Sequence, residues 1–200
     1  MEFLINLAYV ILYSYFIGCF CSAFYLVKFY NKQDIREINS GTVGARNAGR
    51  ILGKKGFIIV FVADFLKTIL ALAITIKFFE SEPHFSILFS ASILSVMIGH
   101  TFPAQLDFKG GKGVVPFTSS IFVINFWVLL VSLIVLFLTL VITRNQKISI
   151  VAAILTTIPS SFFFFGYYPI FLNQTTILAI LFSIILIFFS HLKKSKNVNI

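Results

Sequence analysis

A short segment rich in glycine and lysine, DFKGGKGVV at 107–115, has the composition of an anion-binding loop. Glycines let backbone N–H groups come close to an anion, and a lysine adds a positive charge. A helix predicted to begin near Val114 would point the positive end of its dipole at the same place. Taken alone, the segment also fits a flexible turn without a ligand. The residues predicted to hold the anion are Gly110, Gly111, Lys112 and Gly113.

Nucleotide hydrolysis is not expected of this segment. A Walker A loop needs Ser or Thr directly after its lysine, and here Gly113 follows Lys112. The sequence also shows no strand before the loop, where that motif would need one.

A second glycine-rich segment, NSGTVGARNAGRILGKKG at 39–56, precedes the first one in the chain. Hydroxyl and amide side chains can hydrogen-bond phosphate oxygens, and the guanidinium groups of Arg46 and Arg50 fit them as planar forks. Two such loops on one face of a membrane would serve two phosphates or one phosphate-rich substrate. The substrate-binding residues predicted in this segment are Ser40, Gly41, Asn47 and Arg50.

His100 is the candidate for contact with a reacting group. It opens the stretch GHTFPAQLDFKGGKGV, in which Pro103 is expected to end the preceding helix. A histidine near an anion loop can hydrogen-bond or polarise a reacting oxygen. The alternative is a histidine that is simply satisfied at the membrane boundary. His100 and Lys112 are the predicted catalytic residues.

The composition predicts that membrane helices position these loops. Of the 200 residues, 58% are hydrophobic and 12% are charged, and the mean hydropathy is +0.98. A soluble domain of this length could not bury so much apolar surface. Because a span needs about 20 apolar residues, we expect spans near 3–29, 57–79, 85–100, 148–166 and 168–190, with 114–143 ambiguous. Cys19 and Cys21 are too few for a structural zinc site.

The basic residues settle the ambiguous stretch. They concentrate in 30–56, 101–113, 144–148 and the C-terminal tail, and short cytoplasmic loops collect Lys and Arg. All four segments share one side only if 114–143 crosses twice, turning near Asn125. We therefore predict one all-α membrane domain, 1–200, of seven short transmembrane helices, with the N-terminus outside and the C-terminus cytoplasmic. The net charge of +9 then reflects topology and needs no nucleic-acid partner.

Two opposite charges are predicted inside the membrane. Asp64 and Lys67 lie three residues apart in the span 57–79, and so on one helical face. Charges in the hydrocarbon are costly and usually pair or serve a site. The pair either neutralises itself within its helix or ties that helix to the active-site loops.

With these residues in place, the chain resembles a known family, the bacterial acyl-phosphate:glycerol-3-phosphate acyltransferases of the PlsY type. NSGTVGARN at 39–47 and GRILGKK at 49–55 are similar to the family's G-S-G-N-x-G-A-T-N and L-R-x-L-G-K-K. Asp64 and Lys67 match its D-x-x-K. GHTFP at 99–103 and FKGGKGV at 108–114 match its G-H-x-F-P and F-K-G-G-K-G-V in full.

The chain departs from the family pattern at several positions. Thr42 replaces an Asn, and Arg46 replaces a Thr. Ser149 follows a basic turn similar to the family's serine-bearing turn. The third motif, H-R-x-N-I-x-R-L followed by G-x-E, is incomplete, since only LKKSKNVNI follows His191. This leaves open a non-catalytic member that binds phosphorylated lipid precursors or a partner enzyme. A small organic-phosphate transporter is a second alternative, although no inverted repeat is visible.

The resemblance implies the first step of phospholipid synthesis. A fatty acyl group would pass from acyl phosphate to the 1-hydroxyl of glycerol 3-phosphate, giving lysophosphatidate and phosphate at the cell membrane. No metal, nucleotide or coenzyme A is implied, and the departing phosphate would take the hydroxyl proton. A functional link to the enzyme that makes acyl phosphate is also implied.

The resemblance also gives the residues roles. One group would bind glycerol 3-phosphate: Ser40, Asn47, Arg50 and Ser149. The backbone at 110–113 and Lys112 would hold acyl phosphate, while His100 would orient or polarise a reacting oxygen. The supporting residues would be Asp64, Lys67, Pro103 and His191.

Overall fold

The protein, analysed as a computed structural model, is built from helices and described over residues 1–164 and 173–192. The α-helices in these ranges are α1 Glu2–Cys19, α2 Ser22–Asn31, α3 Ala45–Phe79, α4 Phe85–Thr101, α5 Val114–Ile124, α6 Phe126–Thr143, α7 Gln146–Phe163 and α8 Gln174–Leu192. Two short 3-10 helices, η1 Ile35–Glu37 and η2 Ala104–Leu106, lie in the connections.

The helices have the lengths and apolar character of membrane spans. Among the described residues, 5 segments are long and apolar enough to cross a bilayer: Glu2–Asn31, Ala45–Phe79, Phe85–Leu106, Phe126–Thr143 and Gln146–Phe163. Val114–Ile124 and Gln174–Ser190 are shorter apolar helices. The predicted all-α membrane bundle is therefore confirmed, while seven crossings and the orientation of the termini stay predictions.

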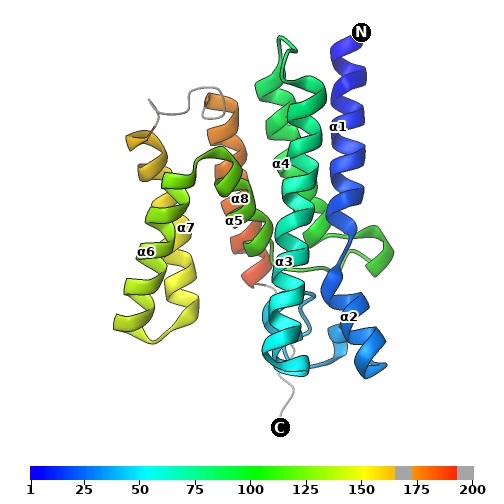
Figure 1. Cartoon of the computed structure of the whole chain (residues 1–200), viewed down its shortest axis with the longest axis vertical. Coiled ribbons are helices and arrows are strands. Elements are labelled where there is room, and N and C mark those ends of the chain that lie inside the picture. The colour runs from blue at the N-terminus through cyan, green and yellow to red at the C-terminus, as the bar shows by residue number, and fades with distance from the viewer. Residues whose placement is uncertain (165–172, 193–200) are drawn as a thin grey trace.

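Small residues bring α1 and α4 into close contact. A Cβ atom added at Gly18 would collide with the Val96 backbone, and one added at Gly99 would collide with the Tyr15 carbonyl. The hydroxyls of Ser14 and Ser92 share a hydrogen bond of 2.9 Å across this interface. Close approach at small residues is how helices pack where lipid competes for apolar contacts. With α3 beside them, these two helices form the body of the molecule (Figure 1).

The span predicted over 3–29 lies within the candidate membrane segment Glu2–Asn31, but this segment is not one continuous helix. Helix α1 ends at Cys19, Phe20 is extended (φ −64°, ψ 98°), and α2 begins at Ser22. A helix end leaves backbone carbonyls without intrahelical partners, and side chains from other elements use all three carbonyls at this break. Lys67 Nζ donates to the Gly18 and Phe20 carbonyls, at 3.0 and 2.7 Å, and Gln105 Nε2 donates to the Cys19 carbonyl.

The loop predicted over 30–56 is shorter than expected, because α3 begins at Ala45 rather than near 57. Gly53 (φ +72°, ψ −167°) kinks this helix at a conformation that suits glycine. The turn predicted over 144–148 is also shorter, since α7 begins at Gln146. Asn145 stops the turn early because its Oδ1 caps α7, accepting from Lys147 and Ile148 N–H groups.

The predicted turn near Asn125 is confirmed. Asn125 separates α5 from α6, and its Oδ1 accepts hydrogen bonds from the N–H groups of Trp127 and Val128 at 2.9 and 3.2 Å. The N-cap supplies an acceptor that the first turn of α6 otherwise lacks.

The basic segments gather at one end of the bundle. In Figure 1 the start of α3 and the turn between α6 and α7 lie toward the lower end, where the 102–113 connection also approaches. The N-terminus and the turn between α3 and α4 lie at the opposite end. One end of an apolar bundle thus carries the two glycine-rich segments and the basic turn.

Candidate active site

The 107–115 loop is held against the end of α4. The Gly110 and Gly111 N–H groups donate to the carbonyls of Thr101 and His100, at 3.1 and 3.0 Å, and the Gly110 carbonyl accepts from Val43 N–H at 3.3 Å. A Cβ at Gly110 would collide with the His100 carbonyl, and a Cβ at Gly111 would collide with the His100 ring. Glycine is needed at both positions because the loop lies directly on α4.

The backbone N–H groups of the loop that remain without a protein acceptor in the described ranges follow Gly111 in the chain. Among the described residues, no protein acceptor is recorded for the N–H groups of Lys112 and Gly113. Gly113 has a φ of +80° and precedes the first turn of α5, whose N–H groups also point out of the helix. Gly110 and Gly111 therefore shape the loop, and the segment from Lys112 into α5 offers the anion-facing N–H groups.

Pro103 helps to fix the same loop. Its carbonyl accepts from Leu106 and Phe108 N–H groups at 3.0 and 3.1 Å. Its ring lies so close to Gly110 that a Cβ there would contact it. The helix before it ends at Thr101, in keeping with the restriction that proline places on preceding residues.

Asp64, Lys67 and His100 form one buried cluster beneath the loop. Lys67 Nζ lies 3.1 Å from Asp64 Oδ1 and 3.0 Å from His100 Nδ1. Asp64 Oδ1 also accepts from the Ser22 hydroxyl at 3.1 Å. The exposed fractions of Asp64, Lys67 and His100 are 1%, 6% and 3%. Asp64 and Lys67 thus neutralise each other within α3, and the contact of Lys67 with His100 ties α3 to α4.

This cluster fixes the imidazole of His100. The Lys67 ammonium has only protons to give, so His100 Nδ1 accepts and the ring proton belongs on Nε2. The Nε2 side faces Gly111, where an added Cβ would collide with it. His100 therefore supports the glycine loop from below.

The glycine-rich segment 39–56 is held together at its start by Asn47. Its Nδ2 donates to the carbonyls of Ile35, Ile38 and Thr42 at 3.2, 3.1 and 3.1 Å, and the residue is 1% exposed. The Ser40 and Thr42 hydroxyls share a hydrogen bond of 2.8 Å.

Gly41 and Ser149 occupy similarly confined positions. Gly41 has a φ of +66°, and a Cβ there would approach the Arg36 carbonyl. Ser149 is buried in the first turns of α7, and its hydroxyl donates to the Asn145 carbonyl at 2.9 Å. The structure thus places Asn47 and Ser149 within the protein framework, close to the segments predicted to bind substrate.

Lys112 is one of four cations, contributed by three segments, that lie near one another. Burial lowers the pKa of Lys112, and the positive charges of Lys147, Arg46 and Arg50 lower it further. Arg46 and Arg50 lie four residues apart near the start of α3, on one helical face. The Ser190 hydroxyl donates to the Lys112 carbonyl at 3.1 Å, which ties α8 to the loop.

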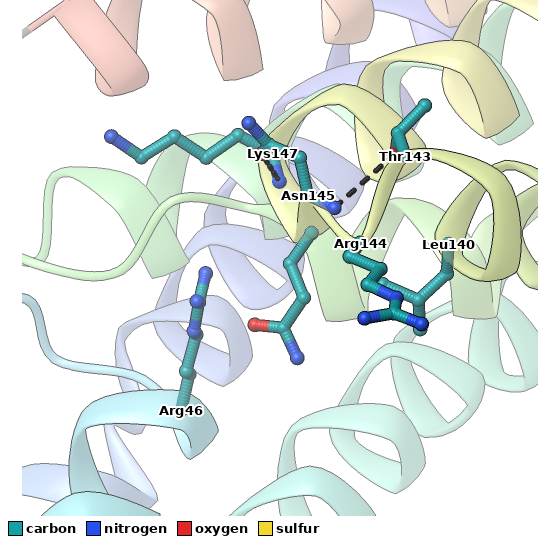
Figure 2. Close-up of a pocket in the computed structure, with 7 residues that line it drawn as sticks. Arg46, Leu140, Thr143, Arg144, Asn145 and Lys147 are labelled. Atoms are coloured by element: carbon teal, nitrogen blue, oxygen red, sulfur yellow. Dashed lines mark hydrogen bonds between the residues drawn. The ribbon is translucent and has the colours of Figure 1, made fainter.

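A pocket of about 780 Å³ opens beside these cations. Figure 2 shows Arg46 reaching from α3 toward the turn that carries Asn145 and Lys147. The pocket is lined by Arg46, Leu140, Thr143, Arg144, Asn145, Gln146 and Lys147. Arg144 and Lys147 were not among the predicted site residues, although the basic turn was visible in the sequence. Arg46 was considered there as a fork for phosphate oxygens but was not included in the predicted substrate-binding set.

These cations have no acidic partners in the described part of the chain. The chain has 7 Asp and Glu residues. The ion pairs among described residues use Asp34 and Asp107 with Arg36, and Asp64 with Lys67. Within the described ranges, no carboxylate is paired with any of the cations that line the pocket or surround Lys112: Arg46, Arg50, Lys112, Arg144 and Lys147.

The last predicted site residue is His191, and the last kind of site to consider is a metal site. His191 lies in the last turn of α8, but its side chain, like residues 193–200, lies outside the described part of the structure. Among the described residues, no group of three or more His, Cys, Asp or Glu side chains could hold a metal ion.

Fold and site together define a polytopic helical membrane protein with a cluster of cations beside a glycine-rich loop at one end of its bundle. The chain belongs to the glycerol-3-phosphate acyltransferase family, whose model matches residues 8–199. The family resemblance seen in the motifs is therefore confirmed.

Individual relatives support this assignment. Glycerol-3-phosphate acyltransferase 1 of Desulfitobacterium hafniense is 37% identical over 150 residues, 74% of this chain and 71% of the relative. The glycerol-3-phosphate acyltransferase of Pelagibacter ubique is 36% identical over 200 residues, 98% of this chain and 95% of the relative.

Solved structures of PlsY (YgiH), an integral membrane glycerol 3-phosphate acyltransferase, share the fold. Its glycerol 3-phosphate form has a TM-score of 0.79 and 26% identity, covering 92% of this chain and 88% of the other. Its lysophosphatidic acid form has a TM-score of 0.77 at the same identity, covering 92% and 87%.

Proposed function

We propose that this protein transfers a fatty acyl group from acyl phosphate to the 1-hydroxyl of glycerol 3-phosphate, releasing lysophosphatidate and inorganic phosphate. The observation that carries the proposal is a group of cations that have no carboxylate partners among the described residues and lie beside a glycine loop, at one end of an apolar bundle. Both substrates carry a phosphate, and one has an apolar tail that belongs in a membrane. The solved relatives bear names that include the same acceptor and product.

The acyl phosphate is assigned to the glycine loop. Lys112 supplies a positive charge, and the N–H groups from Lys112 into the first turn of α5 supply hydrogen bonds to phosphate oxygens. The loop joins an apolar helix, α5, so a phosphate held here leaves the acyl tail beside the hydrocarbon.

The glycerol 3-phosphate is assigned to the facing side of the site. Arg50 reaches from the face of α3 that contributes charge near Lys112, and Ser40 and the Gly41 backbone lie in the preceding loop. Asn47 shapes that loop through its three carbonyl contacts. Ser149 supports the turn at the start of α7.

The chemistry then needs only placement and charge stabilisation. The hydroxyl oxygen of the acceptor attacks the acyl carbonyl carbon, and the bond from that carbon to the phosphate oxygen breaks. The departing phosphate takes the hydroxyl proton. Lys112 and the N–H groups of the loop stabilise the charge that develops on the phosphate, because they are already in place.

His100 is a positioning residue in this mechanism. Its ring is fixed by Lys67 and lies against Gly111, so it sets the position of the loop that holds the acyl phosphate. Asp64 and Lys67 hold the ring from α3, and Pro103 holds the loop from the other side.

The site would face the cytoplasm of the cell. Seven crossings place the basic segments on one side, and Lys and Arg favour the cytoplasmic side of a cell membrane. The N-terminus would then be outside and the C-terminus cytoplasmic. A cytoplasmic site can receive acyl phosphate from the enzyme that makes it, which is the partner we propose.

The experiment uses membranes from a host whose own acyltransferase is disabled, supplied with palmitoyl phosphate and labelled glycerol 3-phosphate. Lysophosphatidate should form with the wild-type chain, and Lys112→Ala should reduce its rate by about 100-fold, as expected when a charge-stabilising donor is lost. Lys32→Ala, which removes an exposed cation outside the pocket, is the control.

A folded wild-type protein that makes no lysophosphatidate overturns the proposal. Binding of glycerol 3-phosphate without turnover would instead identify a non-catalytic member that retains the phosphate site. Equal losses in Lys112→Ala and Lys32→Ala would remove Lys112 from the mechanism.

A further inference from the structure

The pocket beside the turn between α6 and α7 is lined by cations to which the proposed chemistry gives no role. That chemistry assigns Lys112 to the acyl phosphate and Arg50 to the phosphate of glycerol 3-phosphate. Arg46, Arg144 and Lys147 line a further 780 Å³ of open space and have no role in the transfer step.

We propose that Arg46, Arg144 and Lys147 form an outer phosphate subsite, which captures the phosphomonoester acceptor and passes it inward to Arg50, beside Lys112. This inference rests on the proposed function. The three side chains come from α3, the turn before α7 and the first turn of α7, which only the fold brings together. Their common feature is a positive charge without a carboxylate partner among the described residues.

Exposure falls from the outer cations to Lys112. Arg46, Arg144 and Lys147 are exposed, as is Arg50, whereas Lys112 is half-buried. Arg46 and Lys147 nevertheless lie close enough to Lys112 to lower its pKa. An anion drawn to the exposed cations is therefore already within electrostatic reach of the inner lysine. Clefts lined with charge of one sign raise the local concentration of an oppositely charged substrate and its association rate.

A phosphomonoester fits this subsite better than a lipid headgroup. A monoester carries up to about two charges near neutral pH, whereas the phosphodiester of a common phospholipid carries one. Three converging cations therefore favour the monoester. An anionic lipid headgroup remains the other source of the same phosphate chemistry, and the experiment must separate the two.

The test is a steady-state measurement in vesicles of phosphatidylcholine, which has no net charge. Arg46→Ala, Lys147→Ala and the double variant are compared with wild type at salt concentrations from roughly 0.03 M to roughly 0.5 M. The double variant should raise KM for glycerol 3-phosphate by about tenfold at the lowest salt and change kcat by less than about twofold. The KM difference should shrink as salt rises, because exposed charges are screened.

Two control variants make the measurement specific. Arg46→Lys keeps the charge and should recover most of the wild-type KM. Lys32→Ala removes an exposed cation that does not line the pocket and should leave KM unchanged.

Three outcomes overturn the inference while the proposed function stands. They are an unchanged KM in the double variant, a loss confined to kcat, and a KM effect that appears only when anionic lipid is added. The last would assign the pocket to a lipid headgroup.

A second measurement remains informative if the wild-type protein makes no product. Inorganic phosphate should raise the thermal midpoint of the wild-type protein more than that of the double variant, because a ligand that binds only the folded state stabilises it. Equal shifts would overturn the outer subsite independently of catalysis.

Discussion

A buried ammonium needs an acceptor for each of its protons, and Lys67 finds three at distances of 3.0, 2.7 and 3.0 Å. Two of the acceptors are the Gly18 and Phe20 carbonyls, which are available because the first membrane segment breaks there. The third is His100 Nδ1. The Asp64 carboxylate balances the charge from the same helix. A local break in one helix thus creates the site that holds a charge from another.

Lys67→Met should lower the free energy of unfolding by about 3 kcal/mol or more, because it leaves the Asp64 charge buried without a partner. The double variant Asp64→Asn/Lys67→Met should lose less, since it removes both charges together. Chemical unfolding in detergent measures both values. A double variant that is less stable than Lys67→Met would contradict the view that charge balance dominates.

At the level of elements, two asparagines cap the N-termini of α6 and α7 in the same manner. Asn125 Oδ1 caps α6 with hydrogen bonds of 2.9 and 3.2 Å, and Asn145 Oδ1 caps α7 with bonds of 3.0 and 3.4 Å. Asn125 is 2% exposed, whereas Asn145 is exposed. Water can replace the cap at Asn145 but not at Asn125.

Asn125→Ala should therefore destabilise the protein more than Asn145→Ala. Loss of an N-cap costs about 1 kcal/mol, and the buried position adds the cost of N–H groups left without acceptors. Thermal unfolding of both variants in the same detergent gives the comparison. Equal losses would show that the turn at Asn125 is hydrated.

At the scale of the whole molecule, positive charge accumulates at one end of the bundle. The effect is visible in the pKa of Lys112, which burial lowers and Lys147, Arg46 and Arg50 lower further. Folded protein thus holds this proton less firmly than unfolded protein does. The charge on Lys112 opposes folding below its folded pKa, and stability recovers as the pH rises through that value.

The positive charges around Lys112 also predict how activity depends on pH. Phosphate binding needs the Lys112 ammonium, so kcat/KM should fall on the alkaline side earlier than for an ordinary lysine. Arg46→Ala removes one repelling charge and should move this alkaline limb to higher pH. Profiles of kcat/KM for wild type and Arg46→Ala measure the shift. A limb that stays in place would mean that a group other than Lys112 controls it.

The sequence by itself determined the membrane class, the turn at Asn125 and the family. These follow from local properties: apolar length, the placement of basic residues, and glycine-rich motifs that stay contiguous along the chain. The approach of the basic segments to one end of the bundle also agrees with the charge pattern.

Only the tertiary structure decided how the polar side chains are used. The side chains of Asn47 and Ser149 donate hydrogen bonds to backbone carbonyls of the protein itself. The break after Cys19 supplies carbonyl acceptors to Lys67. Neither the sequence around Arg46 nor the sequence at 140–147 by itself predicts the pocket that these two segments form together. Each of these features depends on contacts between residues far apart in the chain, and composition and spacing do not encode which distant groups will meet.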